Sequence, residues 1–417
     1  MTKKSDTPAI RFKGFTDTWE QRKAKELFVS TADKGYPELP VLSATQDRGM
    51  IRRDENSINI FHDKKNEAGY KRVLPGQFVI HLRSFQGGFA HSTIEGITSP
   101  AYTVFGFSEP EKHDSEYWKY VFTSKSFIRR LETVTYGIRD GRSISYEEFL
   151  TLGFVYPSKA EQKAIARYLD KLSDLITLHQ RKYDKLTNVK KSMLEKMFPK
   201  NGSNVPEIRF KGFTEAWEQR KLGEVLISLQ NNTLSRADLS SEEGIAKNIH
   251  YGDILVKFGE VIDVKTESLP MISDETVIAK YKSSFLQNGD VIVADTAEDE
   301  TVGKCTEIAG LSDEIVISGL HTIPYRPLQK YAPGYLGYYM NSASFHNQLL
   351  PLMQGIKVTS ISKTALQNTD ILYPKSATEQ AAIGTYFRNL DNFITLHQRE
   401  LEKLKNIKKS CLENMFV

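Results

Sequence analysis

The sequence predicts an α+β fold in which two globular mixed α/β domains are joined by two long antiparallel coiled-coil helices, in a pseudo-two-fold (cyclic) internal repeat. The first observation is that the block PAIRFKGFTDTWEQRK, from Pro8, returns as PEIRFKGFTEAWEQRK from Pro206. The second is that a helical block from Glu161 returns from Glu379. The residues between these blocks differ almost completely. We call the segment between the two repeated blocks of each half its middle. Repeated blocks around two divergent middles indicate one structural frame that carries two different specificities.

The domain organisation follows from the positions of these blocks. We expect globular domains at residues 1–155 and 206–372, a spacer helix with its linker at residues 156–205, and a second spacer helix at residues 373–417. Joining the end of the chain to its start would restore a near two-fold repeat, and this predicts that the two helices run antiparallel.

The two helical blocks carry the spacing of a coiled coil. Apolar residues alternate at intervals of four and three over about four heptads, a pattern typical of a helix seam. Lys190 and Lys408 lie on the same stripe, and we expect them to reach solvent or to mark where the seam opens. The stripes contain Ile165, Leu169, Leu172, Ile176, His179 and Leu186 in the first helix, and Ile383, Phe387, Leu390, Ile394, His397 and Leu404 in the second.

The middles are predicted to be β-rich with short helices. GQFVIHL from Gly76 and GDVIVAD from Gly289 are short apolar runs introduced by turn residues, as strands often are. YWKYVFTSKSFIRRLE from Tyr117 and YLGYYMNSASFHNQLL from Tyr335 are aromatic-rich and helical in character. Each middle is therefore expected to form a mixed domain of its own.

Composition narrows the class of protein. The 417 residues include 26% charged and 40% hydrophobic residues, as in globular chains, and the net charge of +4 permits a nucleic-acid partner without requiring one. The two cysteines fit a reducing compartment, and the start of the chain resembles no secretory signal. These features predict a cytoplasmic protein with no disulfide framework and no membrane span.

No catalytic pattern is found in the sequence. It contains no phosphate-binding G-x-x-x-x-G-K-[ST] loop, no HExxH and no G-x-S-x-G, and no NPPY- or DPPY-type tetrapeptide of a DNA methyltransferase. His179 and His397, both within TLHQR, are expected to be polar seam residues rather than metal ligands. We therefore expect a chain without catalysis, without a metal and without a cofactor of its own.

Polar, glycine-containing loops in the middles are the candidates for contact with DNA. Arginine reads guanine and amides read adenine in the major groove, whereas hydroxyls and lysines hold phosphates. A single such loop is more often a solvated turn, but these loops recur in both middles. The predicted DNA-binding residues are Thr45, Gln46, Arg48, Arg83, Ser84, Gln86, Arg139, Arg142, Lys357, Thr359 and Ser360.

The duplicated RFKGFT-x-x-WEQRK openings, the two divergent middles and the duplicated EQ…LHQR…K…MF helices resemble the specificity subunit of a Type I restriction–modification system. The resemblance covers essentially the whole chain. It implies that each middle is a target recognition domain for one half of a split DNA sequence. It also implies that the helices set the spacing between the halves, near one helical turn or about 34 Å, and dock two modification subunits. Because the middles differ, the expected target is asymmetric.

The resemblance further implies that the chemistry belongs to partners. S-adenosylmethionine is expected on the modification (methyltransferase) subunits, and ATP and Mg²⁺ are expected on the restriction (translocase and nuclease) subunits. Two other functions stay open from the residues alone. A self-sufficient DNA methyltransferase or nuclease would be active as a purified chain, and a structural adaptor with two protein-binding domains would show no dependence on DNA sequence.

Overall fold

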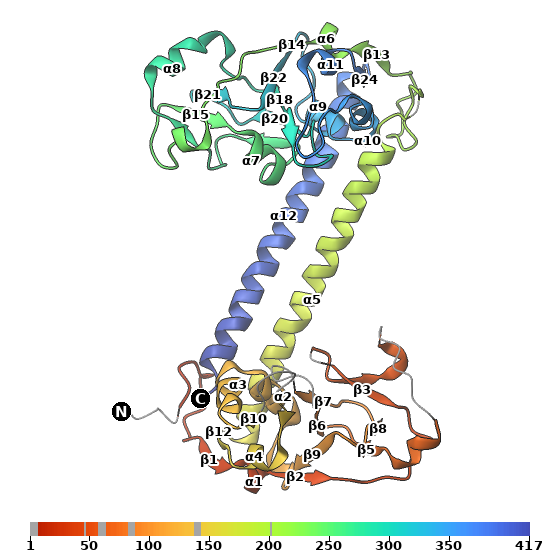
Figure 1. Ribbon diagram of the computed structural model, residues 1–417, viewed down its shortest axis with the longest axis vertical. Coiled ribbons are helices and arrows are strands. Elements are labelled where there is room, and N and C mark those ends of the chain that lie inside the picture. Colours follow the sequence, from red (N-terminus) through yellow and green to blue (C-terminus); the bar gives the residue numbers. More distant parts are fainter. Residues whose placement is uncertain (1–6, 46, 57–63, 82–87, 137–142, 201) are drawn as a thin grey trace. The chain divides into compact units, whose positions relative to one another are not determined.

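The computed structural model describes residues 7–45, 47–56, 64–81, 88–136, 143–200 and 202–417. The chain forms two compact units. Unit 1 contains residues 1–180 and 399–417, and unit 2 contains residues 181–398. Two long helices, α5 (Lys159–Lys196) and α12 (Ala377–Asn414), pass through both units (Figure 1). Two mixed domains joined by two long helices confirm the predicted fold class, whereas the predicted domain boundaries stay predictions.

A short two-stranded ladder opens and closes the globular part of each unit. In unit 1, β1 (Glu20–Lys23) pairs antiparallel with β12 (Gly153–Tyr156). In unit 2, β13 (Glu218–Lys221) pairs in the same way with β24 (Asp370–Tyr373). Both first strands are the repeated EQRK, and both second strands lead into a long helix. The repeated blocks therefore build one frame twice.

Unit 1 is built on a four-stranded antiparallel sheet of order β2-β9-β6-β7. Aromatic side chains from the sheet and from α2 fill its core, with Phe28, Phe78, Phe105, Trp118 and Phe122 all buried. The remaining elements are α1 (Ala24–Leu27), β2 (Phe28–Thr31), β3 (Leu42–Ala44), β4 (Met50–Arg52), β5 (Lys71–Val73), β6 (Phe78–Ile80), β7 (Phe89–His91), β8 (Gly96–Thr98), β9 (Thr103–Phe107), α2 (Ser115–Thr123), α3 (Lys125–Glu132), β10 (Thr135–Tyr136), β11 (Ser143–Ile144) and α4 (Tyr146–Leu150).

Unit 2 is built on a five-stranded sheet of order β14-β22-β18-β20-β16, beside a three-stranded sheet of order β17-β15-β21. Four of the five strands follow the order and the antiparallel pairing of unit 1, and β16 is added parallel to β20. The elements are α6 (Leu222–Val225), β14 (Leu226–Ser228), β15 (Ala246–Ile249), α7 (Tyr251–Val256), β16 (Val261–Asp263), β17 (Met271–Ile272), α8 (Glu275–Lys280), β18 (Val291–Ala294), β19 (Thr296–Ala297), β20 (Cys305–Ala309), β21 (Ile315–Ser318), β22 (Thr322–Pro327), α9 (Tyr335–Met340), α10 (Ala343–His346), β23 (Thr359–Ser360) and α11 (Lys363–Gln367).

The two middles thus share a strand order that their sequences do not reveal. The predicted strand runs from Gly76 and Gly289 become β6 and β18, which occupy the same place in the two sheets. The predicted helical stretches become α2 with α3 and α9 with α10. The differences between the middles lie in the elements added around a common sheet.

The helix pair packs antiparallel within each unit. In unit 1, Lys408 of α12 donates to Ser173 of α5 at 2.8 Å, and Phe416, just past α12, is buried in the core that α5 enters. In unit 2, Lys190 of α5 bonds Asp391 of α12 at 2.6 Å. The predicted seam residues are buried or half-buried in both helices. No helix in the described part of the chain combines the length and hydropathy of a membrane span.

Candidate nucleic-acid interface

A buried ion pair fixes the repeated opening of each unit to its long helix. In unit 1, the Arg11 guanidinium binds both carboxylate oxygens of Glu161 at 2.7 and 2.8 Å. In unit 2, Arg209 binds Glu379 in the same way at 2.6 and 2.9 Å. Both carboxylates are 1% exposed. Bidentate pairing sets orientation as well as distance. The arginine of each RFKGFT segment therefore fixes that segment to the start of the long helix of its unit.

The glutamines of the repeated EQ pairs also have structural roles. Gln162 accepts a bond from the backbone N–H of Asp114 at 2.9 Å and donates to the carbonyl of Pro157 at 2.8 Å. Gln380 bonds Ala332 and Pro374 in the matching way, at 3.0 and 2.9 Å. Each glutamine ties the start of a long helix to the segment that precedes the aromatic helices. The arginine, glutamate and glutamine of the repeated motifs therefore have structural roles in both units.

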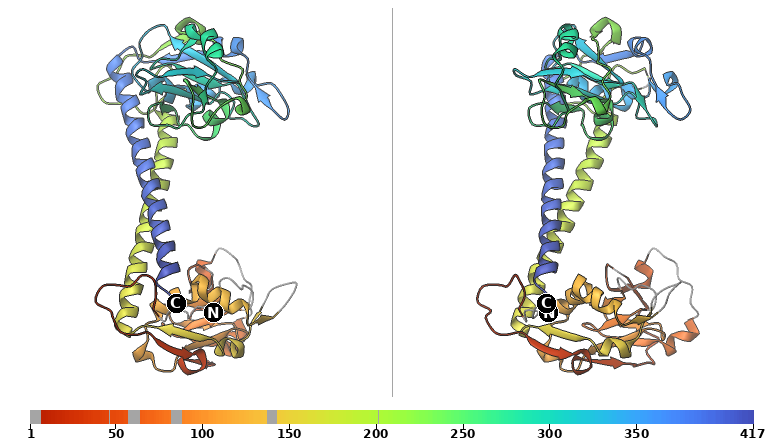
Figure 2. Two further views of the ribbon diagram at one scale, coloured as in Figure 1. Left: turned by 90° about the vertical axis from the view of Figure 1, so that its left-hand side faces the viewer. Right: turned by 60° about the vertical axis from the view of Figure 1, so that its left-hand side comes forward.

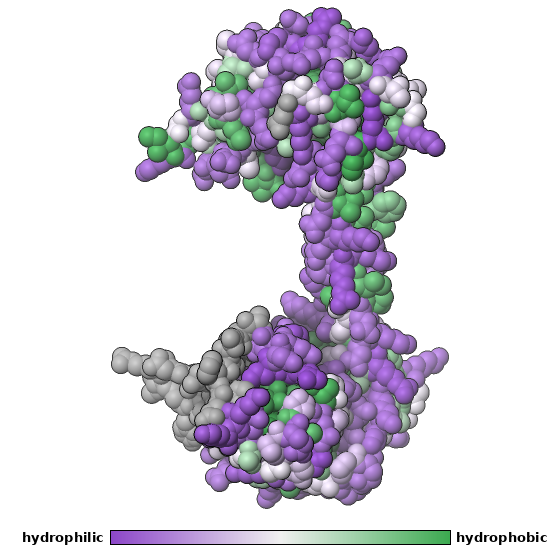
Figure 3. All heavy atoms as spheres, turned by 90° about the vertical axis from the view of Figure 1, so that its right-hand side faces the viewer, coloured by the Kyte–Doolittle hydropathy of each residue, from purple (hydrophilic) through white to green (hydrophobic). Residues whose placement is uncertain are grey.

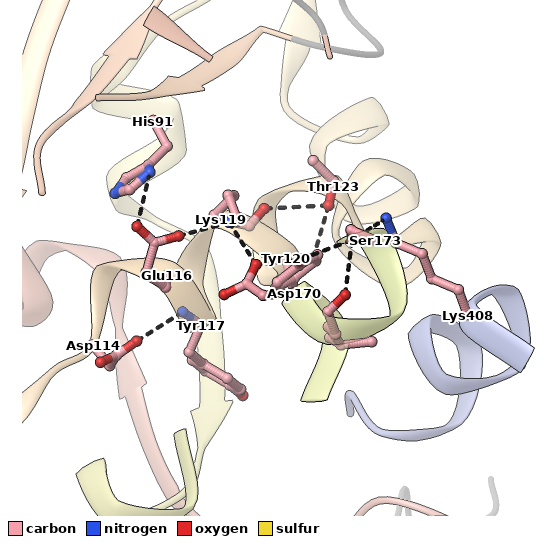
Figure 4. Close-up of polar contacts among 11 residues, drawn as sticks. His91, Asp114, Glu116, Tyr117, Lys119, Tyr120, Thr123, Asp170, Ser173 and Lys408 are labelled. Atoms are coloured by element: carbon pink, nitrogen blue, oxygen red, sulfur yellow. Dashed lines mark hydrogen bonds and ion pairs between the residues drawn. The ribbon is translucent and has the colours of Figure 1, made fainter. Parts of the chain in front are cut away.

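A polar network connects the sheet of unit 1 to its helix pair (Figure 4). Lys119 of α2 lies between Glu116 and Asp170, at 2.6 and 3.0 Å. The Tyr120 hydroxyl donates to Asp170 at 2.7 Å, and burial raises the pKa of Tyr120 to about 12. His91, at the end of β7, faces Glu116 at 3.8 Å. Burial lowers the pKa of His91, although the nearby Glu116 carboxylate acts in the opposite direction.

The same place in unit 2 is built differently. Lys190 corresponds to Lys408 in the helical repeat, but it binds Glu260 and Asp391 at 2.6 Å each, and its side chain is 17% exposed. The Tyr338 hydroxyl donates to Asp391 at 2.6 Å, as Tyr120 does to Asp170 in unit 1. Of the two alternatives for Lys190, that it reaches solvent is wrong, because two carboxylates bind it inside the unit. That it marks where the seam opens stays a prediction.

Two of the predicted DNA-binding residues lie in a tight turn of unit 1, between β3 and β4. The Thr45 hydroxyl donates to the carbonyl of Gly49 at 2.8 Å and accepts from the backbone N–H of Arg48 at 3.1 Å. Thr45 therefore closes the turn, whereas the Arg48 side chain is exposed. Their contact with DNA stays a prediction. Gln46, Arg83, Ser84, Gln86, Arg139 and Arg142 lie outside the described residues.

The other predicted residues lie on a hairpin of unit 2, the light-blue ribbon that projects from the domain in Figure 2. Thr359 and Ser360 form β23, which pairs antiparallel with β19. Lys357 is exposed at the tip of this hairpin. The structure therefore brings Lys357, Thr359 and Ser360 together on one projecting element.

Sequence reasoning missed a polar cluster at the base of this hairpin. Asp295 accepts a bond from the Thr296 hydroxyl at 2.7 Å and lies 3.5 Å from Nδ1 of His321. His321 has a φ of 54°, and the Tyr251 ring packs against its imidazole with centroids 5.2 Å apart. A non-glycine residue in this region is strained, and such strain gathers at functional sites. No local sequence pattern predicts that a histidine such as His321 will have a positive φ.

The described residues contain no group of three or more histidine, cysteine or acidic side chains that could hold a metal ion. Cys305 and Cys411 are both buried, and burial raises the pKa of each thiol. Of the predicted DNA-binding residues that the structure describes, Arg48, Lys357 and Ser360 are exposed.

Comparisons with known proteins agree with this arrangement. Residues 214–406 match the family model of the Type I restriction modification DNA specificity domain. The Type I restriction enzyme MjaVIII specificity subunit of Methanocaldococcus jannaschii is 26% identical over 268 residues, which cover 61% of this chain and 59% of the relative's length.

The fold is similar to that of a solved structure over nearly its whole length. The S subunit of a Type I restriction–modification system from M. genitalium has a TM-score of 0.52 and 14% sequence identity, with 99% of each chain covered. At this identity the similarity is one of fold. The match of residues 214–406 to this domain model and the curated relative make the chain similar to the specificity subunits of Type I restriction–modification systems.

Proposed function

We propose that this chain gives a Type I restriction–modification complex its DNA sequence specificity. Each unit reads one half of a split target, and the two halves are unlike. The observation that carries this proposal is the pairing of one duplicated frame with two different middles. The ladders β1–β12 and β13–β24 and the Arg–Glu anchors repeat, whereas the elements around the common sheet do not.

The chain itself is proposed to be non-catalytic. Adenine methylation, ATP-driven translocation and cleavage would belong to the modification and restriction subunits of the complex. The exposed Arg48 and Lys357 side chains suit contacts with bases or phosphates. A net charge of only +4 agrees with a subunit whose partners supply part of the phosphate contacts.

The test is to map adenine methylation in a host without methylation of its own, after co-expression of the chain with its modification subunit. We expect methylation at a split, asymmetric motif with a fixed gap. Methylation by the chain alone would instead favour a self-sufficient methyltransferase. Unmethylated DNA despite a stable, partner-bound complex would favour the structural adaptor.

The outward faces of the two helices are proposed to dock the two modification subunits. The seam residues are buried or half-buried, but Leu175 and Leu178 of α5 are 42% and 46% exposed. Their repeat counterparts on α12, Phe393 and Leu396, are 54% and 51% exposed. Most of the surface drawn in Figure 3 is hydrophilic, with hydrophobic residues in separate small groups. An apolar pair that returns at the same positions of the repeat indicates two similar docking faces.

The double substitution Phe393→Ser/Leu396→Ser should remove one of the two modification subunits. The expected stoichiometry, measured by light scattering or native mass spectrometry, falls from two modification subunits per chain to one, because the Leu175 and Leu178 face is intact. Ile245→Ser, at a residue of unit 2 with 48% exposure, is the matched control and should keep both. Two bound subunits in the double variant would exclude this face as the docking site.

A further inference from the structure

The hairpin of residues 354–360 in unit 2 is held rigidly at its base. Gln354 and Ser360 exchange backbone hydrogen bonds of 2.9 and 2.8 Å, and Thr296 of β19 pairs with Ser360. Gly355, with a φ of 122°, makes the turn possible, because a Cβ there would collide with the carbonyl oxygen of Val358. The tip is therefore positioned by its own backbone pairing and does not depend on a ligand for its shape.

The polar cluster ties this base to the main sheet. The backbone N–H of Ile361, just after β23, donates to the carbonyl of Asp295 at 2.9 Å. The N–H of Asp295 in turn donates to the carbonyl of His321 at 3.1 Å, at the start of β22. A side chain carried on a rigid element can be placed accurately against a partner.

The tip exposes two aliphatic side chains on either side of a lysine. Ile356 is fully exposed (101%) and Val358 is 54% exposed, with Lys357 between them. Figure 3 shows hydrophobic residues at the projecting edge of unit 2. Single exposed aliphatic residues are common on protein surfaces, but two of them on a rigid, projecting tip leave apolar surface in water that a partner would cover.

DNA fits this tip better than a protein does. Two aliphatic side chains offer far less area than the roughly 800 Å² per partner that a stable protein interface buries. An apolar side chain can, however, enter between stacked base pairs, as architectural DNA-binding proteins use Ile, Leu or Phe. Lys357 supplies a positive charge for the phosphate beside such a step. The hairpin also lies within the segment that matches the DNA specificity domain.

We propose that the tip of this hairpin is a DNA wedge: Ile356 inserts between two adjacent base pairs in or beside the half-site read by unit 2, and Lys357 contacts a neighbouring phosphate. The inference rests on the proposed function. Because unstacking a step costs less at flexible pyrimidine–purine steps, the wedge adds specificity at base pairs that no side chain reads directly.

The test uses the complex of the full chain with its modification subunits and duplexes that carry its mapped target. A 2-aminopurine base, whose fluorescence rises when it is unstacked, is placed at successive positions of the target. With the wild-type chain we expect a rise at one step that is distinct from the methylated adenine. Ile356→Ala should abolish that rise, keep the signal at the methylated adenine and weaken binding of the target by about tenfold.

Leu328→Ala is the matched control. Leu328 is 60% exposed in the same unit. It follows the last residue of β22, whereas His321, beside the base of the hairpin, precedes the first. This variant should keep both the fluorescence rise and the affinity. If the Ile356→Ala complex keeps both the fluorescence rise and the affinity, the wedge proposal is wrong, while the proposed function stands. Loss of a modification subunit from that variant would make the tip a protein contact and would also overturn it. A wild-type complex that does not prefer its target would overturn the proposed function itself.

Discussion

Arg209→Met is expected to lower the free energy of unfolding of unit 2 by about 3 to 5 kcal/mol. The substitution removes the only cation that pairs with the Glu379 carboxylate in the described residues, and that carboxylate is 1% exposed. It also removes the bond from Arg209 to the carbonyl of Glu215 at 2.7 Å. A buried charge without its partner is far more costly than the pair is stabilising.

The measurement is thermal unfolding of the purified chain. For a unit of about 200 residues, a loss of this size corresponds to a decrease in melting temperature of roughly 10 °C. Arg220→Met is the control, because Arg220 pairs with Glu218 at 3.0 Å on the surface and should change stability by about 1 kcal/mol at most. If both variants have the same melting temperature, the Arg209–Glu379 pair does not stabilise unit 2 as expected.

The same substitution in unit 1 tests whether the two anchors are equivalent. Arg11→Met removes the partner of Glu161, which is also 1% exposed. In unit 2 the Trp217 indole N–H donates to Glu379 at 3.3 Å, whereas the Trp19 indole nitrogen has no partner among the described residues. The Glu161 carboxylate therefore lacks this additional donor. We expect Arg11→Met to lower the stability of unit 1 at least as much as Arg209→Met lowers that of unit 2.

Lys190→Met is expected to destabilise unit 2 by about 3 kcal/mol near neutral pH. Lys190 lies between the carboxylates of Glu260 and Asp391, at 2.6 Å from each. Burial lowers the pKa of Lys190, but these two carboxylates outweigh that effect and raise it. Without the ammonium group, two negative charges would face each other in a partly buried place.

The loss should depend on pH in a definite direction. Burial raises the pKa of Asp391 even with Lys190 present, and removing the lysine raises it further. A carboxyl group with a raised pKa in the folded protein binds its proton more tightly there, so its contribution to stability falls as pH rises through that pKa. Lys190→Met should therefore regain stability as the solution is acidified towards the pKa of Asp391, and chemical unfolding at several pH values measures this.

Lys408→Met provides a contrast within the same chain. Lys408 bonds only the neutral Ser173 hydroxyl among its described hydrogen bonds and ion pairs. Burial and the nearby Lys119 lower its pKa, so the lysine carries its charge at some cost. Its loss should change stability by less than about 1 kcal/mol. Equal losses for Lys190→Met and Lys408→Met would mean that the two positions are equivalent despite their different partners.

The helices and the repeated frame could be predicted from the sequence because both depend on local patterns. The spacing of Ile165, Leu169 and Leu172 is set by the period of the helix, and these residues are buried. The shared strand order of the middles could not be predicted. A sheet core requires apolar side chains of suitable volume rather than particular residues, so Val291–Ala294 and Phe78–Ile80 occupy the same place without visible similarity.

The candidate site was predictable only in part. Lys357, Thr359 and Ser360 were predicted from their chemistry, and the structure places them on one hairpin, whereas their contact with DNA stays a prediction. Ile356 stands in the same segment, but an aliphatic residue indicates a core position unless its exposure is known. His321 and Asp295 meet only because the start of β22 returns beside the end of β18. Contacts of this kind depend on tertiary pairing, which no local pattern encodes.

The most direct test of two independent recognition units is an exchange of one middle. Residues 20–155 are replaced by the corresponding segment of another specificity subunit, and adenine methylation is mapped after co-expression with the modification subunit. We expect one half of the split motif to change while the other half and the gap between them are kept. An unchanged motif, or a simultaneous change of both halves, would contradict the assignment of one half-site to each unit.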